Sequence, residues 1–456
     1  MANKENKHTM TDLYQMQSLP LSAKIRMTQN RINGWIDEFG ENGVYVSFSG
    51  GKDSTVLVDI VRNVCGYKNI QLVFVDVPTQ YPELKQFAMT FDNLVILKPE
   101  ISFAEVCEKY GFPLISKEVS NCVSGARKYL KYLDNKKKAN TILTDRQTDR
   151  QTDRQTDRQT DRQTIPYACY MADLLGIDRR INKQNEQYKS LQMGVIPSGS
   201  EYRLRRLNGE LTDSNGNYSQ FNQERYKFFL EAPFEISDLC CDIMKKKPAH
   251  EYEKETDRKP IIATMATESV MRTQKWLQEG CNAFNVTRPN SKPMSFWTEQ
   301  DVLLYIKENA DRMINNPWRI KPKAEEVMKY GKRMVYRTTG GTAPYYPKEY
   351  GAICSVYGDV VTDYKSMGQC ENQMSFADYG IFDNERPLLK TTGCTRTGCV
   401  LCGFGCHLEK EPNRFQMLKE THPKFYNLLH ILKNNGVTYA EAIDWINEHG
   451  NMNIKY

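Results

Sequence analysis

The feature that most constrains this chain is a short apolar segment followed by a glycine-rich turn and a helical pattern. Residues 44–48 read VYVSF, a β-branched and aromatic run typical of a strand, and residues 49–54 read SGGKDS. From Ser54 to Val64 the apolar residues recur at helical spacing. A strand that turns directly into a helix can present backbone N–H groups and Lys52 to one anion. The pattern therefore predicts a phosphate site.

The residue types of this loop suit the backbone and side-chain contacts that a nucleotide phosphate needs. We expect the phosphates to be bound by Ser49, Gly50, Gly51, Lys52, Asp53 and Ser54. The glycines let the backbone come close, and the serines can donate hydroxyl hydrogen bonds. Asp53 can either cap the helix or help to hold Mg²⁺. A classical P-loop is excluded, because Val46 occupies its first glycine position and Asp53 follows the lysine.

Further apolar runs at residues 70–77 and 94–97 alternate with helical patterns, and an amphipathic helix is expected over residues 18–39, ending at Gly40. This alternation predicts an α/β fold with a doubly wound, mostly parallel sheet and a helical, cysteine-rich C-terminal part. Asp76 ends the second strand, where open α/β sheets bind ligands. We expect it to act in catalysis and nucleotide binding, with a turn-stabilising role as the alternative.

The composition changes along the chain predict its organisation. The expected order is an N-terminal helix (1–40), a nucleotide-binding α/β core (41–143), a repeat insertion (144–164), a continuation of the core with a Cys-Cys pair (165–310), a loop-rich insertion (311–380) and a cysteine-rich end with closing helices (381–456).

Charge and hydropathy narrow the class of protein. The net charge of +6 is too small to indicate a nucleic-acid binder but suits an anionic substrate. The chain contains no apolar run of the ~18 residues that a membrane-spanning helix needs, and its start shows no secretory signal. We therefore expect a cytoplasmic protein without a membrane partner. In that compartment 13 cysteines indicate metal or redox chemistry rather than disulfides.

Residues 144–163 repeat the letters TDRQ, and Thr164 starts another copy. The repeat is polar throughout and cannot contribute to a core, so we expect a disordered segment or a solvated helix. If its codons are ACA-GAC-AGA-CAG, the gene carries a run of the tetranucleotide ACAG, whose slippage would shift the reading frame. The resulting hypothesis is phase variation, and mixed synonymous codons in the tract would contradict it.

Six cysteines form two patches along the chain. They are the adjacent Cys240 and Cys241, and the later group Cys394, Cys399, Cys402 and Cys406. A Cys-x2-Cys turn presents two sulfurs to one ion, and a distant pair can complete the four ligands of an iron–sulfur cluster or a structural Zn²⁺. The spacing predicts a metal site and leaves both metals open.

These motifs together resemble the phosphoadenosine phosphosulfate (PAPS) reductase family, within the PP-loop superfamily of adenine-nucleotide α-hydrolases. The resemblance rests on the SGGKDS loop and on residues 110–113 (YGFP), 116–120 (SKEVS), 268–272 (ESVMR) and 297–302 (WTEQDV). It implies that Lys117 and Arg272 also bind the nucleotide. It further implies one [4Fe–4S] cluster, or Zn²⁺ as the alternative, on Cys240, Cys241, Cys399 and Cys402, with Cys394 and Cys406 as alternative ligands.

Two departures from the family pattern bear on the reaction. Assimilatory reductases end in a catalytic cysteine within an ECGLH tail, whereas this chain ends in GNMNIKY, and Met265 stands where an arginine often grips the sulfonucleotide. The intact loop is similar to that of ATP pyrophosphatases, which split ATP between its α and β phosphates. We therefore expect ATP-dependent adenylation coupled to sulfur transfer or redox sulfur chemistry, with ATP, Mg²⁺ and the catalytic residues Lys52, Asp53 and Asp76.

Two other functions stay open. Reduction of PAPS or adenylyl sulfate would need Cys406 or Cys370 as its nucleophilic thiol. A zinc-stapled nucleotide-binding adaptor without catalysis, in a phase-variable or defence system, is the other alternative. The expected partners are an adenine nucleotide and a sulfur donor or thiol reductant protein, and a homo-oligomer stays open. Basic runs at 128–138 and 203–206 would suit a nucleic-acid acceptor, although solvated helix faces explain such runs as well.

Overall fold

The structure is a computed structural model, and it describes residues 6–152, 199–316, 319, 326–330, 333–337, 351–363 and 388–456. The chain divides into two compact units. Unit 1 comprises Met1–Phe103 and Cys241–Val400, and unit 2 comprises Ala104–Cys240 and Leu401–Tyr456. Both units are therefore built from segments that lie far apart in the sequence. The six-part division expected from composition stays a prediction.

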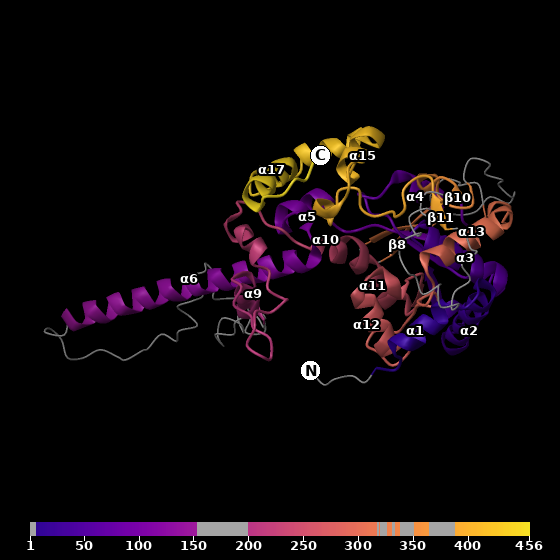
Figure 1. The fold of residues 1–456 in the computed structure, drawn as a ribbon, viewed down its shortest axis with the longest axis horizontal. Helices are drawn as coiled ribbons and strands as arrows, with labels where there is room; N and C mark the ends of the chain where they lie inside the picture. Colours follow the sequence, from indigo (N-terminus) through magenta and orange to yellow (C-terminus); the bar gives the residue numbers. More distant parts are fainter. Residues whose placement is uncertain are drawn as a thin grey trace, which may run out of the picture. The chain divides into compact units, whose positions relative to one another are not determined.

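Within the described residues, unit 1 is built on a sheet with the strand order β6-β7-β5-β1-β2-β3-β9-β8. Figure 1 labels β8 of this sheet and the helices of the same unit. Its strands are β1 (Val44–Ser47), β2 (Leu72–Val75), β3 (Leu94–Leu97), β5 (Lys259–Ile262), β6 (Asn282–Ala283), β7 (Asn290–Ser291), β8 (Glu326–Tyr330) and β9 (Arg333–Arg337). The five central strands pair in parallel. β6, β9 and β8 pair antiparallel with their neighbours at the two ends. The mixed, mostly parallel sheet confirms the α/β class.

The helices of unit 1 follow the expected alternation with strands. They are α1 (Met10–Gln17), α2 (Leu21–Phe39), α3 (Lys52–Asp59), α4 (Pro82–Ala88), α11 (Lys247–Thr256), α12 (Val270–Glu279) and α13 (Glu299–Ile314). The predicted helix over 18–39 is confirmed as α2, which Gly40 ends at a φ of 75°. A small antiparallel pair, β10 (Val360–Thr362) and β11 (Leu389–Thr391), also belongs to this unit.

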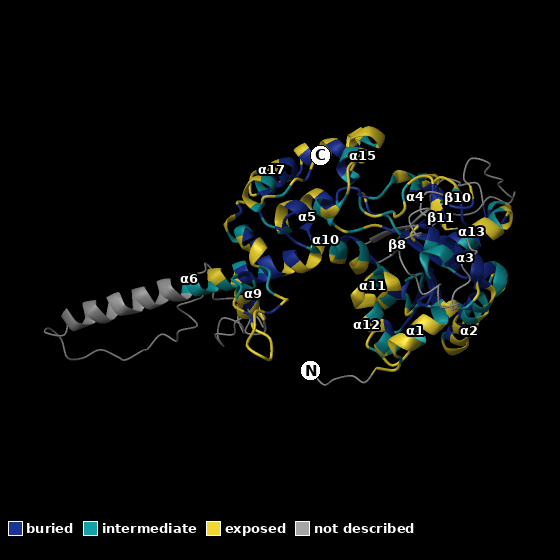
Figure 2. Cartoon of the chain, viewed as in Figure 1, coloured by how far each residue is buried: buried dark blue, intermediate teal, exposed yellow. Residues whose placement is uncertain are grey.

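Alternation along the strands explains why both faces of the sheet are covered. Val44, Val46 and the alternate residues of β2 and β3 are buried in one cluster with α2, α3 and α13. Tyr45 points to the opposite face, where it packs edge-on against Tyr252 of α11. Figure 2 shows α3 buried over most of its length. The helix that carries the glycine-rich loop is therefore held firmly against the sheet.

Unit 2 is mostly helical in the residues that the structure describes. Its elements are α5 (Phe103–Tyr110), α6 (Lys117–Thr152), α9 (Ser200–Leu207), α15 (Arg414–Thr421), α16 (Pro423–Tyr426) and α17 (Tyr439–Gly450), with the short pairs β4 (Leu114–Ile115) to β12 (Gly403–Phe404) and β13 (Lys433–Asn434) to β14 (Val437–Thr438). Its core contains Tyr439, whose ring stacks on Phe112 at 4.7 Å. The Tyr439 hydroxyl donates to the Leu401 carbonyl at 2.9 Å. The described residues after 412 contain the helices α15, α16 and α17, and the helical, cysteine-rich C-terminal part expected over 381–456 stays a prediction.

Some expectations fall on residues that the structure does not describe. The backbone of the repeat is helical as far as Thr152, within α6, and its remainder lies outside the described residues. The first part of the core continuation expected over 165–310, up to residue 198, and most of the loop-rich insertion at 311–380 also lie outside them. Among the described helices, none is both long enough and apolar enough to cross a membrane.

Candidate functional site

The SGGKDS loop connects β1 to α3, and its hydroxyl groups shape it from within. The Ser54 hydroxyl lies 3.0 Å from the Ser49 hydroxyl and donates to the Gly51 carbonyl at 2.9 Å. The Ser49 backbone N–H donates in turn to the Ser54 hydroxyl at 3.2 Å. Gly51 is the N-cap of α3, so the first N–H groups of that helix face the loop. The predicted strand, turn and helix are confirmed.

Two glycines of the loop stand in tight places, and at Gly50 a side chain would not fit. Gly50 has a φ of +72°, and an added Cβ would meet the Leu84 carbonyl oxygen at 2.8 Å. A Cβ on Gly51 would lie 3.2 Å from the Tyr357 hydroxyl and 3.5 Å from the Thr397 hydroxyl. Gly51 therefore keeps open the space between the loop and a segment far along the chain.

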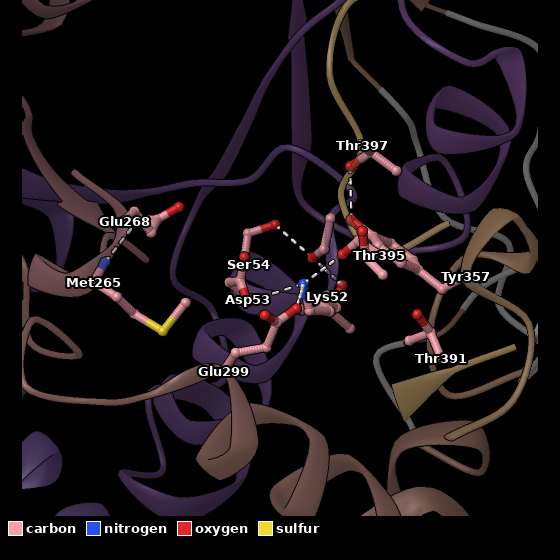
Figure 3. A network of polar contacts seen from close by, with 12 residues as sticks. Lys52, Asp53, Ser54, Met265, Glu268, Glu299, Tyr357, Thr391, Thr395 and Thr397 are labelled. Atoms are coloured by element: carbon pink, nitrogen blue, oxygen red, sulfur yellow. Dashed lines mark hydrogen bonds and ion pairs between the residues drawn. The ribbon is translucent and has the colours of Figure 1, made fainter. Parts of the chain in front are cut away.

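Lys52 is buried and is contacted by groups from two distant parts of unit 1 (Figure 3). Its Nζ donates to the Thr395 carbonyl at 2.8 Å and lies 3.1 Å from Glu299 Oε1. The same atom lies 5.5 Å from the ring centre of Tyr357. The lysine charge is thus balanced mainly by Glu299, which begins α13.

Asp53 is the least satisfied polar side chain of the loop. Its Oδ1 is buried and has no hydrogen-bond partner among the described residues, and Lys52 Nζ lies 3.9 Å from it. Burial raises the pKa of Asp53, Glu268 and Glu299 raise it further, and Lys52 and Arg396 lower it. A buried carboxylate oxygen without a partner suits a cation, so Asp53 fits the expected Mg²⁺ ligand.

These residues line a cavity of about 270 Å³ in unit 1. Its lining is formed by Ser47, Ser49, Gly51, Lys52, Asp53, Ser54, Ile262, Ala263, Thr264, Met265, Glu268, Arg272, Glu299, Tyr357, Arg396 and Thr397. The wall after β5 includes Met265, whose backbone N–H donates to Glu268 Oε2 at 3.0 Å. Glu268 also forms an ion pair with Arg272. The predicted nucleotide ligand Arg272 is thus at the cavity, with its charge paired.

The opposite wall is a segment close to the C-terminal cysteines. The Thr397 hydroxyl lies 2.6 Å from the Tyr357 hydroxyl, and Thr395 provides the carbonyl that Lys52 binds. Burial raises the pKa of Tyr357, so its phenol stays neutral. Sequence reasoning did not find Tyr357, Thr395 or Thr397. Glu299 could have been found, because Thr298 and Asp301 form a capping box that marks the start of its helix.

Two predicted nucleotide-binding residues do not line the cavity. Asp76 follows β2, and its Oδ2 forms an ion pair with Lys85 of α4 at 3.2 Å. Its backbone N–H donates to the Leu97 carbonyl at 2.7 Å, which continues the pairing of β2 with β3 by one residue. Lys117 begins α6 and belongs to unit 2. Their roles in catalysis and binding stay predictions.

The cysteines expected to hold a metal are divided between the units. Cys241, Cys394 and Cys399 fall in unit 1, whereas Cys240, Cys402 and Cys406 fall in unit 2. Among the residues that the structure describes, no three His, Cys, Asp or Glu side chains are grouped so that they could hold a metal ion. The expected site draws its ligands from both units, and the [4Fe–4S] cluster and its Zn²⁺ alternative stay predictions.

Two of these thiols are also poorly ionised. Burial raises the pKa of Cys406 to about 12, and it raises the pKa of Cys394 as well. Both groups are therefore neutral thiols near pH 7, which makes them weak nucleophiles. Cys370 lies outside the described residues.

Comparison with known proteins supports the family resemblance. Residues 43–172 match the family model described as the phosphoadenosine phosphosulfate reductase domain. The matched range includes the whole loop from Ser49 to Ser54 and the later residue Lys117. No curated protein and no solved structure matches the chain.

Proposed function

Because the chain carries a domain of the PAPS reductase family, we propose that it is a PP-loop enzyme that acts at the α-phosphate of an adenine nucleotide. The proposed reaction is ATP-dependent adenylation of an acceptor, coupled to sulfur transfer or redox sulfur chemistry. The observation that carries the proposal is the cavity of about 270 Å³ around the SGGKDS loop, into which Lys52 and the helix N-terminus of α3 bring positive charge.

In this reaction the loop binds the phosphates and stabilises the leaving group. The backbone N–H groups after Gly51 and the ammonium of Lys52 bind the phosphate oxygens. An acceptor oxygen attacks the α-phosphorus, the bond from that phosphorus to the bridging oxygen breaks, and pyrophosphate leaves with the electron pair. Lys52 stabilises the charge that develops on pyrophosphate. A sulfur nucleophile from a separate donor then displaces AMP from the adenylated acceptor.

Asp53 is the residue that would hold Mg²⁺, since its Oδ1 has no hydrogen-bond partner within the described part of the chain. When bound, Mg²⁺ supplies neutralisation of the phosphate charge. Glu268 and Glu299 line the same cavity and add negative charge near Asp53. Three carboxylates around one cavity would repel a nucleotide that carries no cation.

The products of ATP cleavage test the proposal. The protein should convert ATP to AMP and pyrophosphate, or exchange labelled pyrophosphate into ATP, once an acceptor is present. Lys52→Ala should abolish both, whereas Lys275→Ala, an exposed lysine of α12, should leave them unchanged. Formation of ADP and phosphate, or equal activity in both variants, would contradict cleavage at the α-phosphate by this loop.

Reduction of PAPS or adenylyl sulfate is the second candidate, and the matched domain favours it. It would require a thiolate that attacks the sulfur and a thiol reductant that regenerates the enzyme. Cys406 is a poor choice because burial raises its pKa to about 12. Release of sulfite from PAPS in the presence of thioredoxin would favour the reductase, and its loss in Cys370→Ser or Cys406→Ser would name the thiol.

The [4Fe–4S] cluster on Cys240, Cys241, Cys399 and Cys402 remains part of the proposal, supported by the thiol chemistry and spacing of these residues. Anaerobic purification followed by iron, sulfide and zinc analysis tests for the cluster. A protein that holds the cluster should be brown, and the substitution Cys399→Ala should remove the colour. A protein that binds zinc and releases no pyrophosphate would favour the alternative function, a nucleotide-binding adaptor without catalysis. The cytoplasmic location and the sulfur donor partner stay part of the proposal.

A nucleic-acid acceptor is the least supported of the proposed partners. In unit 2 the arginines of α9 contact their own unit: Arg206 pairs with Glu118, and Arg205 donates to the Glu210 carbonyl at 3.3 Å. The Arg203 side chain lies against Gly125 of α6. These contacts leave less charge for phosphates than the sequence pattern suggests, and an RNA or DNA filter-binding assay at two salt concentrations would test it.

A further inference from the structure

The cavity beside the SGGKDS loop contains three basic and three acidic side chains, and most of these charges are already paired. Lys52 lies 3.1 Å from Glu299, and Arg272 forms an ion pair with Glu268. Arg396 lines the same cavity but has no hydrogen bond or ion pair with any described residue. It is therefore the cation of the cavity whose charge is not committed to a carboxylate.

The backbone on both sides of Arg396 is held in place by contacts within unit 1. Thr395 accepts the hydrogen bond of Lys52 at 2.8 Å, and the Thr397 hydroxyl lies 2.6 Å from the Tyr357 hydroxyl. Further out, the Cys394 N–H donates to the Val356 carbonyl at 2.9 Å. On the other side, the Val400 N–H donates to the Thr79 carbonyl at 2.7 Å. An arginine between such anchors is restricted at its Cα, which lowers the entropy lost when its side chain binds.

The cavity geometry places Arg396 beside the reactive part of the loop. Arg396 and Lys52 line the same cavity, and Thr395, the residue before Arg396, accepts the hydrogen bond of Lys52 at 2.8 Å. Phosphates bound next to Lys52 therefore lie within the field of Arg396. Guanidinium groups bind phosphate oxygens with two parallel hydrogen bonds, which an ammonium cannot do.

We propose that Arg396 binds the β- and γ-phosphates of the nucleotide and thereby selects a polyphosphate over a monophosphate. The inference rests on the proposed function, since it assigns a ligand to the same cavity. It also explains how the site can bind an anion although Met265 provides no charge on the opposite wall. In the proposed reaction, Arg396 and Lys52 together stabilise the pyrophosphate that leaves.

Calorimetric titration of the full chain with ATP, pyrophosphate and AMP tests this inference. Arg396→Ala should weaken ATP and pyrophosphate binding about tenfold to 100-fold, the usual effect of losing a charged hydrogen-bond donor. AMP binding should change less than about threefold. Arg396→Lys should fall between wild type and alanine. Arg26→Ala, an exposed arginine of α2 outside the cavity, is the matched control.

The outcomes separate this inference from the proposed function. If ATP and pyrophosphate bind Arg396→Ala as tightly as wild type while Lys52→Ala abolishes binding, the role of Arg396 is refuted and the site stands. An equal loss of ATP and AMP affinity would also refute it, because selection among phosphates would be absent. If the wild-type protein binds none of the three ligands, the proposed function fails, and this inference fails with it. Thermal unfolding checks that each variant is folded.

Discussion

Glu299 balances the charge of Lys52, so removing the charge of Glu299 should strengthen nucleotide binding. The substitution Glu299→Gln keeps the size of the side chain and eliminates the ion pair at 3.1 Å. Lys52 then no longer divides its charge between Glu299 and the phosphates. The negative potential that the cavity presents to an incoming nucleotide also decreases.

The magnitude follows from the separation and the exposure of the pair. At this distance Coulomb's law gives about 1.3 kcal/mol in water and about 5 kcal/mol at an effective dielectric constant of about 20. The Glu299 side chain is 41% exposed, so solvent screening places the effect near the lower value. A change of about 1 kcal/mol corresponds to about fivefold tighter binding.

The assay is titration with ATP in EDTA, which removes any contribution of Glu299 to metal binding. Glu308→Gln, an exposed glutamate of the same helix α13, is the matched control and should bind ATP as wild type does. The advantage of Glu299→Gln should shrink at high salt, because screening weakens the ion pair. Weaker ATP binding by Glu299→Gln in EDTA would refute the reasoning, since it would mean that Glu299 contacts the nucleotide.

Three substitutions test other parts of the account. Gly50→Ala should cost about 1–3 kcal/mol of stability and abolish ATP binding, because the positive φ and the Leu84 carbonyl leave no room for a Cβ. Urea unfolding measures the stability and titration measures the binding, and a variant that binds ATP as tightly as wild type would contradict this prediction. Asp53→Asn should raise the melting temperature at pH 7, because the raised pKa of Asp53 makes its ionised form unfavourable in the folded state. The difference in melting temperature should decrease as the pH falls towards 3.8, the ordinary pKa of an aspartate. A difference that stays constant from pH 4 to 8 would contradict the raised pKa. Arg312→Ala should lower the free energy of unfolding by about 2 kcal/mol, because the buried Asp59 carboxylate loses its charged hydrogen-bond donor. A decrease below about 0.5 kcal/mol would contradict this prediction, because the neutral donors around Asp59 would then be enough to stabilise its charge.

Local sequence patterns were enough to locate β1, β2, β3 and the loop. The apolar run at residues 94–97 coincides with β3, and Gly40 ends α2 as its position predicted. Both features depend on neighbouring residues alone, through strand propensity and a positive φ. The strands on the other side of β1 were not predicted: β5 is short and contains Pro260, and β6 and β7 each comprise two residues.

The remote wall of the cavity could not be predicted, because it depends on tertiary contacts. Lys52 and Thr395 lie 343 residues apart, and the group that accepts the hydrogen bond is a backbone carbonyl, which leaves no mark in the sequence. Tyr357 has no motif around it. Asp76 illustrates a different difficulty. Its position at the end of a strand was predicted correctly, but the rule that ligands bind at the carboxyl ends of parallel strands does not reveal that Lys85 pairs with it.

Hydrogen–deuterium exchange of the full chain with and without ATP and Mg²⁺ tests most directly whether the SGGKDS loop binds the nucleotide phosphates. We expect slower exchange of the backbone amides in peptides that cover residues 49–56 and 393–400, because the N–H groups and side chains of these peptides surround the cavity. Peptides from α17 should not change. Protection confined to other segments, in a protein that titration shows to bind ATP, would contradict the assignment of the site.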